Sequence, residues 1–235
     1  MKNKLSTLVM AATLLSQSGL GRASEAVEDF QTWGNVTATG SFAALNPDLQ
    51  GWRYWLEGQG RFGNDTSRYS QSLIRGGVGY DVMERLNVWL GYAYVTTDRP
   101  FAANPFDEHR VWQQLLWTEP FSWGSFMSRT RMEQRFMEVG NETGWRFRQF
   151  FKLSVPFTFA PDFMWVAYNE VFVDINKTDW KPANGFDQNR FFTGLGYRFT
   201  PNIHTEIGYM NQFIRRKNNP DFVNHNLSVN LYLNY

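Results

Sequence analysis

Arginine and glutamate recur at every second position in several segments of this chain, and Arg129, Arg131, Glu133 and Arg135 form the clearest series. A guanidinium group is a planar fork that binds carboxylate or phosphate. Charged side chains at every second position would share one face of a strand. Such a face would form either a salt-bridged polar interior or a path or site for small anionic solutes. The predicted site residues are Arg53, Glu57, Arg61, Arg75, Arg110, Arg129, Arg131, Glu133, Arg135, Arg146, Arg148, Lys152, Glu170, Arg190 and Glu206.

Hydrolysis by a serine and a histidine is the main enzymatic alternative, because such a pair oriented by a third polar group makes an active nucleophile. The 3 histidines are His109, His204 and His225, and no serine stands two residues from any of them. A serine can still approach His225 from another strand, so no catalytic residue is assigned. Three histidines at these separations make a poor metal site, and we expect no metal or cofactor.

Composition narrows the class of protein. Lys and Arg number 23 against 22 Asp and Glu, so the chain lacks the basic excess of a nucleic-acid binder. There is no cysteine, which excludes disulfides and thiolate sites. The 10 Trp, 10 Tyr and 21 Phe among 235 residues suit the aromatic belts of a membrane barrel.

The charged residues alternate with apolar ones, as side chains do on a strand. In the segment 52–62, Trp52, Leu56 and Phe62 share one face, whereas Arg53 and Glu57 share the other. Similar segments are predicted at 123–136, 145–155, and about 30–42, 68–80, 86–96, 108–118, 163–174, 187–199, 202–215 and 222–235. Each is close to the roughly 9–11 residues that a tilted strand needs to cross hydrocarbon.

The start of the chain is typical of a secretory signal peptide over residues 1–26. Lys2 and Lys4 form a positive region, an apolar stretch follows, and Ala23 or Ala26 ends a small-residue cleavage site. No apolar segment approaches the roughly 20 residues of a spanning helix. If residues 27–235 form an integral membrane domain, that domain must therefore be a β-barrel.

A soluble lipocalin-like barrel or sandwich is the alternative, with its apolar face buried and its charges in water. Two features favour the membrane version. One is the last segment, where an apolar face ends on an aromatic residue and is typical of the signal read by the barrel-assembly machinery. That predicted assembly signal is Leu227, Val229, Leu231, Leu233 and Tyr235.

The second feature is the placement of aromatic residues at predicted strand ends. Short connections also alternate with long polar ones, as periplasmic turns and external loops do. The sequence therefore predicts a single antiparallel transmembrane barrel with a polar, charged lumen. About eleven candidate strands are present, yet single-chain bacterial barrels have even numbers. We expect 12 strands, one of which the pattern does not reveal. The alternative is 10 strands, with residues 27–51 forming an arm or plug that does not span the membrane.

Several short sequence segments resemble those of an uncharacterised bacterial family known as domain of unknown function 2490. They are Tyr54-Trp55-Leu56-Glu57, Arg61-Phe62, Leu90-Gly91-Tyr92-Ala93-Tyr94, Trp112-Gln113-Gln114, Arg129-Thr130-Arg131-Met132-Glu133-Gln134-Arg135, Phe186-Asp187-Gln188-Asn189-Arg190, Ile214-Arg215-Arg216 and Asn224-His225. The resemblance covers nearly the whole mature chain. It implies an outer-membrane barrel and supplies no activity or catalytic residues.

The sequence therefore predicts a Sec-exported, monomeric protein of the bacterial outer membrane. Its expected partners are outer-membrane lipid, the assembly machinery and small anionic solutes, without nucleic acid. Three roles stay open: a narrow channel, a small-solute binder or a structural envelope protein. The alternative from another class is a lipid-modifying hydrolase with a Ser/His site at the external rim.

Overall fold

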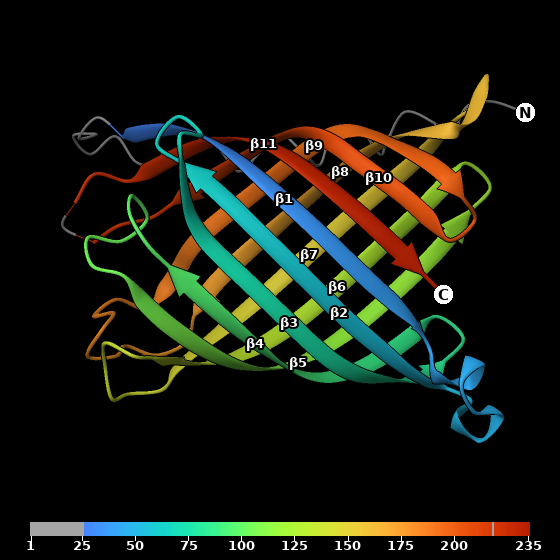
Figure 1. Ribbon diagram of the computed structural model, residues 1–235, viewed down its shortest axis with the longest axis horizontal. Helices are drawn as coiled ribbons and strands as arrows, with labels where there is room; N and C mark the ends of the chain where they lie inside the picture. The colour runs from blue at the N-terminus through green and yellow to red at the C-terminus, as the bar shows by residue number, and fades with distance from the viewer. Residues whose placement is uncertain (1–25, 218) are drawn as a thin grey trace, which may run out of the picture.

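The computed structural model describes residues 26–217 and 219–235, and within them eleven strands form a closed barrel (Figure 1). Apart from Ala26, the predicted signal peptide lies outside the described residues. The strands are β1 (Val27–Ser41), β2 (Trp52–Gly63), β3 (Arg68–Met83), β4 (Leu86–Thr97), β5 (Phe106–Phe121), β6 (Gly124–Met137), β7 (Gly144–Phe157), β8 (Ala160–Asp174), β9 (Gly185–Thr200), β10 (Ile203–Ile214) and β11 (Phe222–Asn234). Among these residues, no helix is long and apolar enough to cross a membrane.

The prediction of 12 strands, with 10 as the alternative, is wrong. Residues 27–41 form the full strand β1, and they are neither an arm nor a plug. Because the strand number is odd, β1 and β11 run in the same direction, and the barrel closes by a parallel ladder from Val27 opposite Phe222 to Thr39 opposite Asn234 (Figure 1). All other neighbouring strands are antiparallel.

The connections at the two ends of the barrel differ in length. One end, the loop end, carries residues 64–67, 98–105, 138–143, 175–184 and 215–221. The other, the turn end, carries the two-residue connections 84–85, 122–123, 158–159 and 201–202. It also carries η1 (Phe42–Ala44) and η2 (Pro47–Leu49), which link β1 to β2. Apart from 42–51 and 64–67, long and short connections alternate as the sequence predicted.

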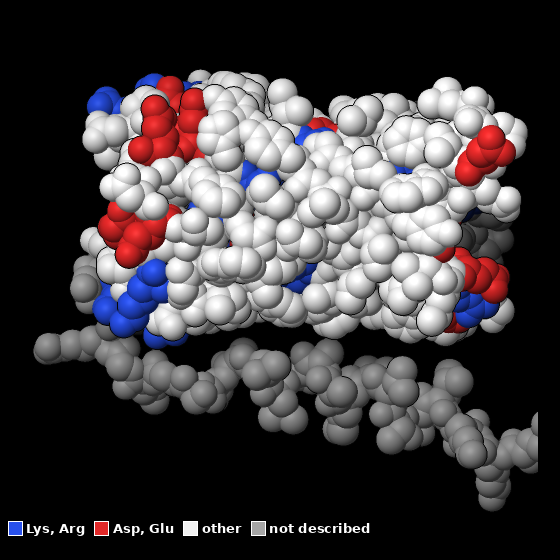
Figure 2. All heavy atoms as spheres, turned by 90° about the horizontal axis from the view of Figure 1, so that it is seen from below, with Lys and Arg blue, Asp and Glu red and all other residues white. Residues whose placement is uncertain are grey.

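Side chains alternate between the lumen and the outer surface along each strand. On β6, Arg131 and Glu133 are buried in the lumen, whereas Phe136 on the opposite face is 43% exposed. In the described part of the chain, outward-facing charges on strands lie near strand ends, as at Glu28 and Asp107. Figure 2 shows a largely uncharged band with Lys, Arg, Asp and Glu gathered mainly toward the two ends. The apolar face of the strands is therefore outside and the charged face inside.

Polar side chains on the outer surface hydrogen-bond to one another across neighbouring strands. The side-chain amides of Gln113 on β5 and Gln134 on β6 exchange two hydrogen bonds of 3.0 Å. Those of Asn169 on β8 and Asn189 on β9 exchange two more, at 3.2 and 3.0 Å. These amides therefore satisfy much of their hydrogen-bonding capacity without water.

The lumen is partly filled by two apolar clusters. One contains Trp55, Trp89, Ala93 and Trp112, and the other contains Trp33, Met164, Val166, Phe192 and Met210. Gly91 makes room for the first cluster, because a Cβ atom there would lie 2.2 Å from a ring carbon of Trp112. The interior thus combines aromatic packing with the charged face predicted from the sequence.

Candidate functional site

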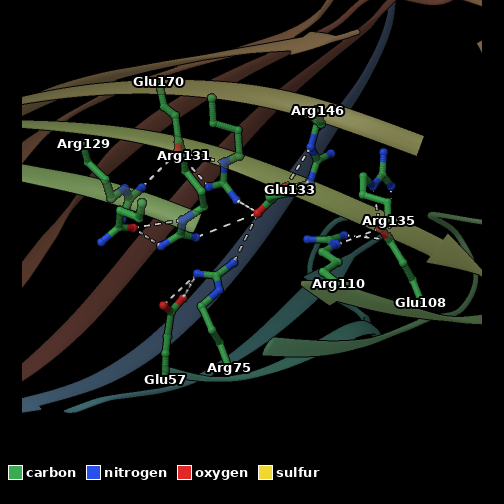
Figure 3. A network of polar contacts seen from close by, with 12 residues as sticks. Glu57, Arg75, Glu108, Arg110, Arg129, Arg131, Glu133, Arg135, Arg146 and Glu170 are labelled. Carbon is green, nitrogen blue, oxygen red and sulfur yellow. Dashed lines mark hydrogen bonds and ion pairs between the residues drawn. The ribbon is translucent and has the colours of Figure 1, made fainter. Parts of the chain in front are cut away.

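Glu133 is the centre of a network of buried charges in the lumen (Figure 3). It accepts hydrogen bonds from Arg146 at 2.6 Å and from Arg148 at 2.6 Å, both on the adjacent strand β7. Arg75 on β3 lies 4.0 Å from the same carboxylate, although β3 is not a neighbour of β6 in the sheet. The network therefore spans the lumen as well as following the wall.

Two further carboxylates extend this network. Glu170 on β8 accepts hydrogen bonds from Arg148 at 2.7 Å and from Arg129 at 2.9 Å. Glu57 accepts two from Arg75 at 3.0 and 2.8 Å. Charge-assisted hydrogen bonds of this kind are stronger than neutral ones, and they hold side chains from five strands, β2, β3, β6, β7 and β8.

Arg131 is held mainly by groups other than carboxylates. It donates to the amide oxygen of Gln114 at 3.0 and 2.5 Å, and its guanidinium carbon lies 4.6 Å from the centre of the Trp112 ring. Its distance to Glu133 is 3.9 Å. Arg131 thus links the charged network to the tryptophan cluster by a cation–π contact.

A second charged group surrounds Glu108 toward the loop end. Its carboxylate accepts hydrogen bonds from Arg110 at 2.8 and 2.7 Å, and also from Arg135. The Arg135 guanidinium carbon lies 5.1 Å from the ring centre of Trp180, in the loop 175–184. This group therefore connects the lumen wall to the loop above it.

The loops 138–143 and 175–184 are joined at Asp179. Its carboxylate accepts backbone N–H groups from Asn141 at 2.8 Å, Glu142 at 3.4 Å and Trp180 at 3.0 Å. These hydrogen bonds, that of Asn141 foremost, hold the pKa of the Asp179 carboxyl below its usual range. Trp180 also donates its indole N–H to the Glu142 carbonyl at 2.8 Å, so the two loops form one unit.

Arg61 and Arg190 lie outside these ion pairs. Their guanidinium carbons are 3.8 and 4.9 Å from the centre of the Trp33 ring. Arg61 donates to the side-chain oxygens of Gln71 at 2.5 Å and Gln59 at 2.8 Å, and its buried Nε has no partner. The Nε of Arg190 is likewise buried without a partner.

Two cavities occupy the lumen. The loop-end cavity has a volume of about 510 Å³, and the turn-end cavity has a volume of about 650 Å³. Five side chains line both cavities and so mark the boundary between them: Trp33, Gln59, Arg75, Arg148 and Arg190. Arg190 therefore lies at the boundary between the two cavities, and Arg61 lines the loop-end cavity.

The predicted site residues do not all come together. Most belong to the network of Glu133, Glu170 and Glu57 or to the Glu108 group. Arg53 lies near the turn end, 3.4 Å from Asp81, with about a third of its side chain exposed. Glu206 forms a separate pair with Lys152 across the lumen, from β10 to β7.

Several lumen residues were not predicted. Glu108 and Trp112 flank Arg110 at a spacing of two, so the alternation already contained a signal for them. Asp187 lies 3.8 Å from Arg146, but it sits where the β8–β9 register shifts, and simple alternation does not reach it. Trp33 carries no charge, and its sequence position gave no sign that two arginines contact its ring.

The histidines have partners other than serine. The Nδ1 atom of His225 lies 2.6 Å from the Tyr209 hydroxyl, and His109 pairs with the Tyr92 hydroxyl. His204 Nε2 lies 3.7 Å from a Glu206 oxygen. Among the described residues, no group of three or more His, Asp and Glu side chains is arranged to hold a metal ion.

The apolar residues of the predicted assembly signal lie on the outer face of β11. Leu227 and Val229 are exposed, and Leu231 and Leu233 are half-buried. The backbone of Tyr235 bonds to β1 through Ser41 N–H and the Thr39 carbonyl, and its side chain is exposed. The end of β11 is therefore part of the seam that closes the barrel.

Residues 30–224 match the family model described as protein of unknown function (DUF2490). The chain belongs to the DUF2490 family. The predicted resemblance is thus confirmed, and the DUF2490 match begins in β1 and ends in β11. An uncharacterized protein of Methylorubrum extorquens is 34% identical over 232 residues, covering 97% of each chain. No solved structure gives a significant match to this DUF2490 chain.

Proposed function

We propose that this protein spans the bacterial outer membrane, with the loop end outside the cell and the turn end in the periplasm. The outward faces of the strands support insertion into the membrane, because a lipid-facing Arg or Lys near the midplane would cost about 2–4 kcal/mol. The paired outer amides support it as well. Hydrocarbon contains no water to satisfy a polar group, so each group needs a partner in the protein.

Aromatic side chains near both ends of the barrel agree with membrane insertion. Phe62 and Trp145 are exposed near the loop end, and Trp52, Tyr80 and Phe199 are exposed near the turn end. Amphipathic aromatic rings favour the interface between hydrocarbon and headgroups, and outer-membrane barrels carry a girdle of them at each interface. The exposed apolar surface between the two ends would otherwise favour aggregation in water.

We further propose that the lumen is a narrow path for small anions. The observation that carries this proposal is the charge of the cavity walls. Seven arginines and three carboxylates line the loop-end cavity, and seven Arg or Lys side chains and three carboxylates line the turn-end cavity. Cationic walls of low dielectric concentrate anions and exclude cations.

The test is a recording from the purified mature protein in planar bilayers under a KCl gradient. We expect a small conductance whose reversal potential indicates a preference for chloride. A preference for potassium, or a membrane that conducts no better than one without protein, would contradict the anion path. Fractionation of cells tests the location independently. The protein is expected in the outer membrane and should migrate differently on gels before and after boiling.

A further inference from the structure

The loop-end cavity has a cationic interior that the protein itself does not neutralise. Arg190 lies directly opposite Glu170 in the β8–β9 ladder, yet that carboxylate bonds to Arg129 and Arg148 instead. Among the described residues, no carboxylate lies within ion-pair distance of Arg190 or Arg61, and both Nε atoms are buried without partners. Both side chains are half-buried, and a charge partly removed from water without a counter-ion is unfavourable, so these two arginines together favour an anion from solution.

Aromatic rings hold Arg190 in a fixed orientation. Its guanidinium carbon lies 4.9 Å from the ring centre of Trp33 and 4.6 Å from that of Phe172. Arg61 contacts the same Trp33 ring at 3.8 Å. Both guanidinium groups therefore contact one indole and line the same cavity, where a small oxyanion can reach them. A preorganised fork of this kind suits the planar geometry of a carboxylate.

The mouth of the loop-end cavity is apolar. Pro100, Phe101, Phe106, Ile214 and Phe222 line it from the loop 98–105 and from strand ends at the loop end. A bare inorganic anion would gain nothing from this surface, whereas an apolar group attached to the anion would be removed from water. The volume of about 510 Å³ lies within the range of small-molecule sites.

We propose that this cavity binds a small carboxylic acid with an apolar body. Its carboxylate is held by Arg190 and Arg61, and its apolar body lies against the mouth residues. The inference deepens the proposed function, because it names the class of anion that the lumen retains. It places the binding site beside the boundary between the two cavities, where a bound acid would also obstruct the path for smaller ions.

The test is calorimetric titration of the mature protein in lipid nanodiscs, with empty nanodiscs subtracted. The probes are benzoate, acetate and inorganic phosphate. We expect benzoate to bind at least about tenfold more tightly than either of the others, since the cavity removes its ring from water. Equal binding of benzoate and acetate, or tighter binding of phosphate, would overturn the proposal of an apolar acid.

Variants locate the site. Arg190→Gln and Arg61→Gln should each weaken benzoate binding about tenfold or more, the effect of losing a charged hydrogen bond. Arg198→Gln is the matched control, because Arg198 is on the same strand as Arg190 but lines neither cavity. Phe101→Ala, in a loop, should weaken benzoate and leave acetate unchanged. Folding of each variant is checked by the gel shift on boiling.

The outcomes separate the two proposals. If Arg190→Gln and Arg61→Gln fold and bind benzoate as the parent does, the site is wrong, whatever the bilayer recordings give. Chloride preference in that same case would leave the anion path standing. If benzoate binding depends on both arginines but the bilayers show no anion preference, the path is wrong and the site stands.

Discussion

Arg148 donates from Nη1 to Oε1 of Glu133 at 2.6 Å, and the pair links β7 to β6 inside the barrel. Glu133 is 0% exposed and also accepts from Arg146, so a single carboxylate is the shared partner of two buried guanidinium groups. Removing such a partner leaves uncompensated charge in the interior, which costs far more than the pair contributes when intact. Glu133 is therefore the residue on which the polar interior depends most.

Replacement of Glu133 tests this dependence. Glu133→Gln keeps the shape of the side chain but removes its charge, and we expect the free energy of unfolding to fall by about 3–5 kcal/mol. The measurement is urea unfolding in lipid vesicles. Asp162→Asn, an exposed carboxylate near the turn end, is the control and should unfold like the parent. Identical curves for all three proteins would show that Glu133 is not the hub.

The tryptophan cluster predicts a contrast between two glycines. A Cβ atom on Gly91 would lie 2.2 Å from Trp112 Cζ2 and 2.4 Å from the Gly76 carbonyl oxygen, whereas a Cβ atom on Gly58 would meet nothing within 4 Å. Gly91→Ala should therefore destabilise the barrel by about 1–3 kcal/mol through overpacking. Gly58→Ala should change the unfolding midpoint little. Tolerance of Gly91→Ala equal to that of Gly58→Ala would argue against a packed tryptophan cluster.

Alternation along strands explains why part of this site was predictable. The spacing of Arg129, Arg131 and Glu133 indicates which face of β6 carries charge, because side-chain direction on a strand is local. Which arginine meets which carboxylate depends on neighbouring strands, so the unpaired state of Arg190 could not be read from its segment. The closure of the barrel likewise depends on strands that lie far apart in the sequence. The strand candidates near 30–42 and 222–235 were correct, yet only the parallel β1–β11 ladder shows that an odd number closes.

The outer amide pairs predict how the surface responds to single and double changes. Asn169→Leu removes both hydrogen bonds that Asn189 exchanges with Asn169, and in hydrocarbon this should cost at least about 1 kcal/mol. Replacing both residues by Leu removes the unsatisfied group and should restore much of the stability. A double-mutant cycle in lipid vesicles measures this coupling. Additive effects of the two changes would mean that water reaches this surface.

The Asp179 junction predicts a change in the loops at low pH. Because the pKa of the Asp179 carboxyl is lowered, its charged form stabilises the contact between the loops 138–143 and 175–184. This contribution is complete above the ordinary carboxyl pKa and is lost as the pH falls through the lowered value. Hydrogen exchange at Asn141 and Glu142, corrected for its intrinsic pH dependence, should therefore accelerate on acidification.

Two variants check the assignment to Asp179. Asp179→Asn should exchange rapidly at neutral pH and lose much of the acid-dependent step. Asp98→Asn is the control, because Asp98 is also a loop carboxyl with a lowered pKa, held mainly by the Arg99 N–H, but it lies in the loop 98–105. It should leave the exchange of Asn141 unchanged. An unaltered acid step in Asp179→Asn would assign that step to another group.

Lipid contact of the outer surface tests the central claim most directly. The chain has no native cysteine, so single cysteines can carry a fluorescent label at Ile74 and Leu90 on the outward faces of β3 and β4, and at Val139 and Phe159 at the two ends. The protein is reconstituted in vesicles whose lipids are brominated at mid-chain. Strong quenching at Ile74→Cys and Leu90→Cys with weak quenching at Val139→Cys and Phe159→Cys is the predicted result. Equal quenching at all four positions, or none at Ile74→Cys and Leu90→Cys, would contradict a membrane-spanning barrel.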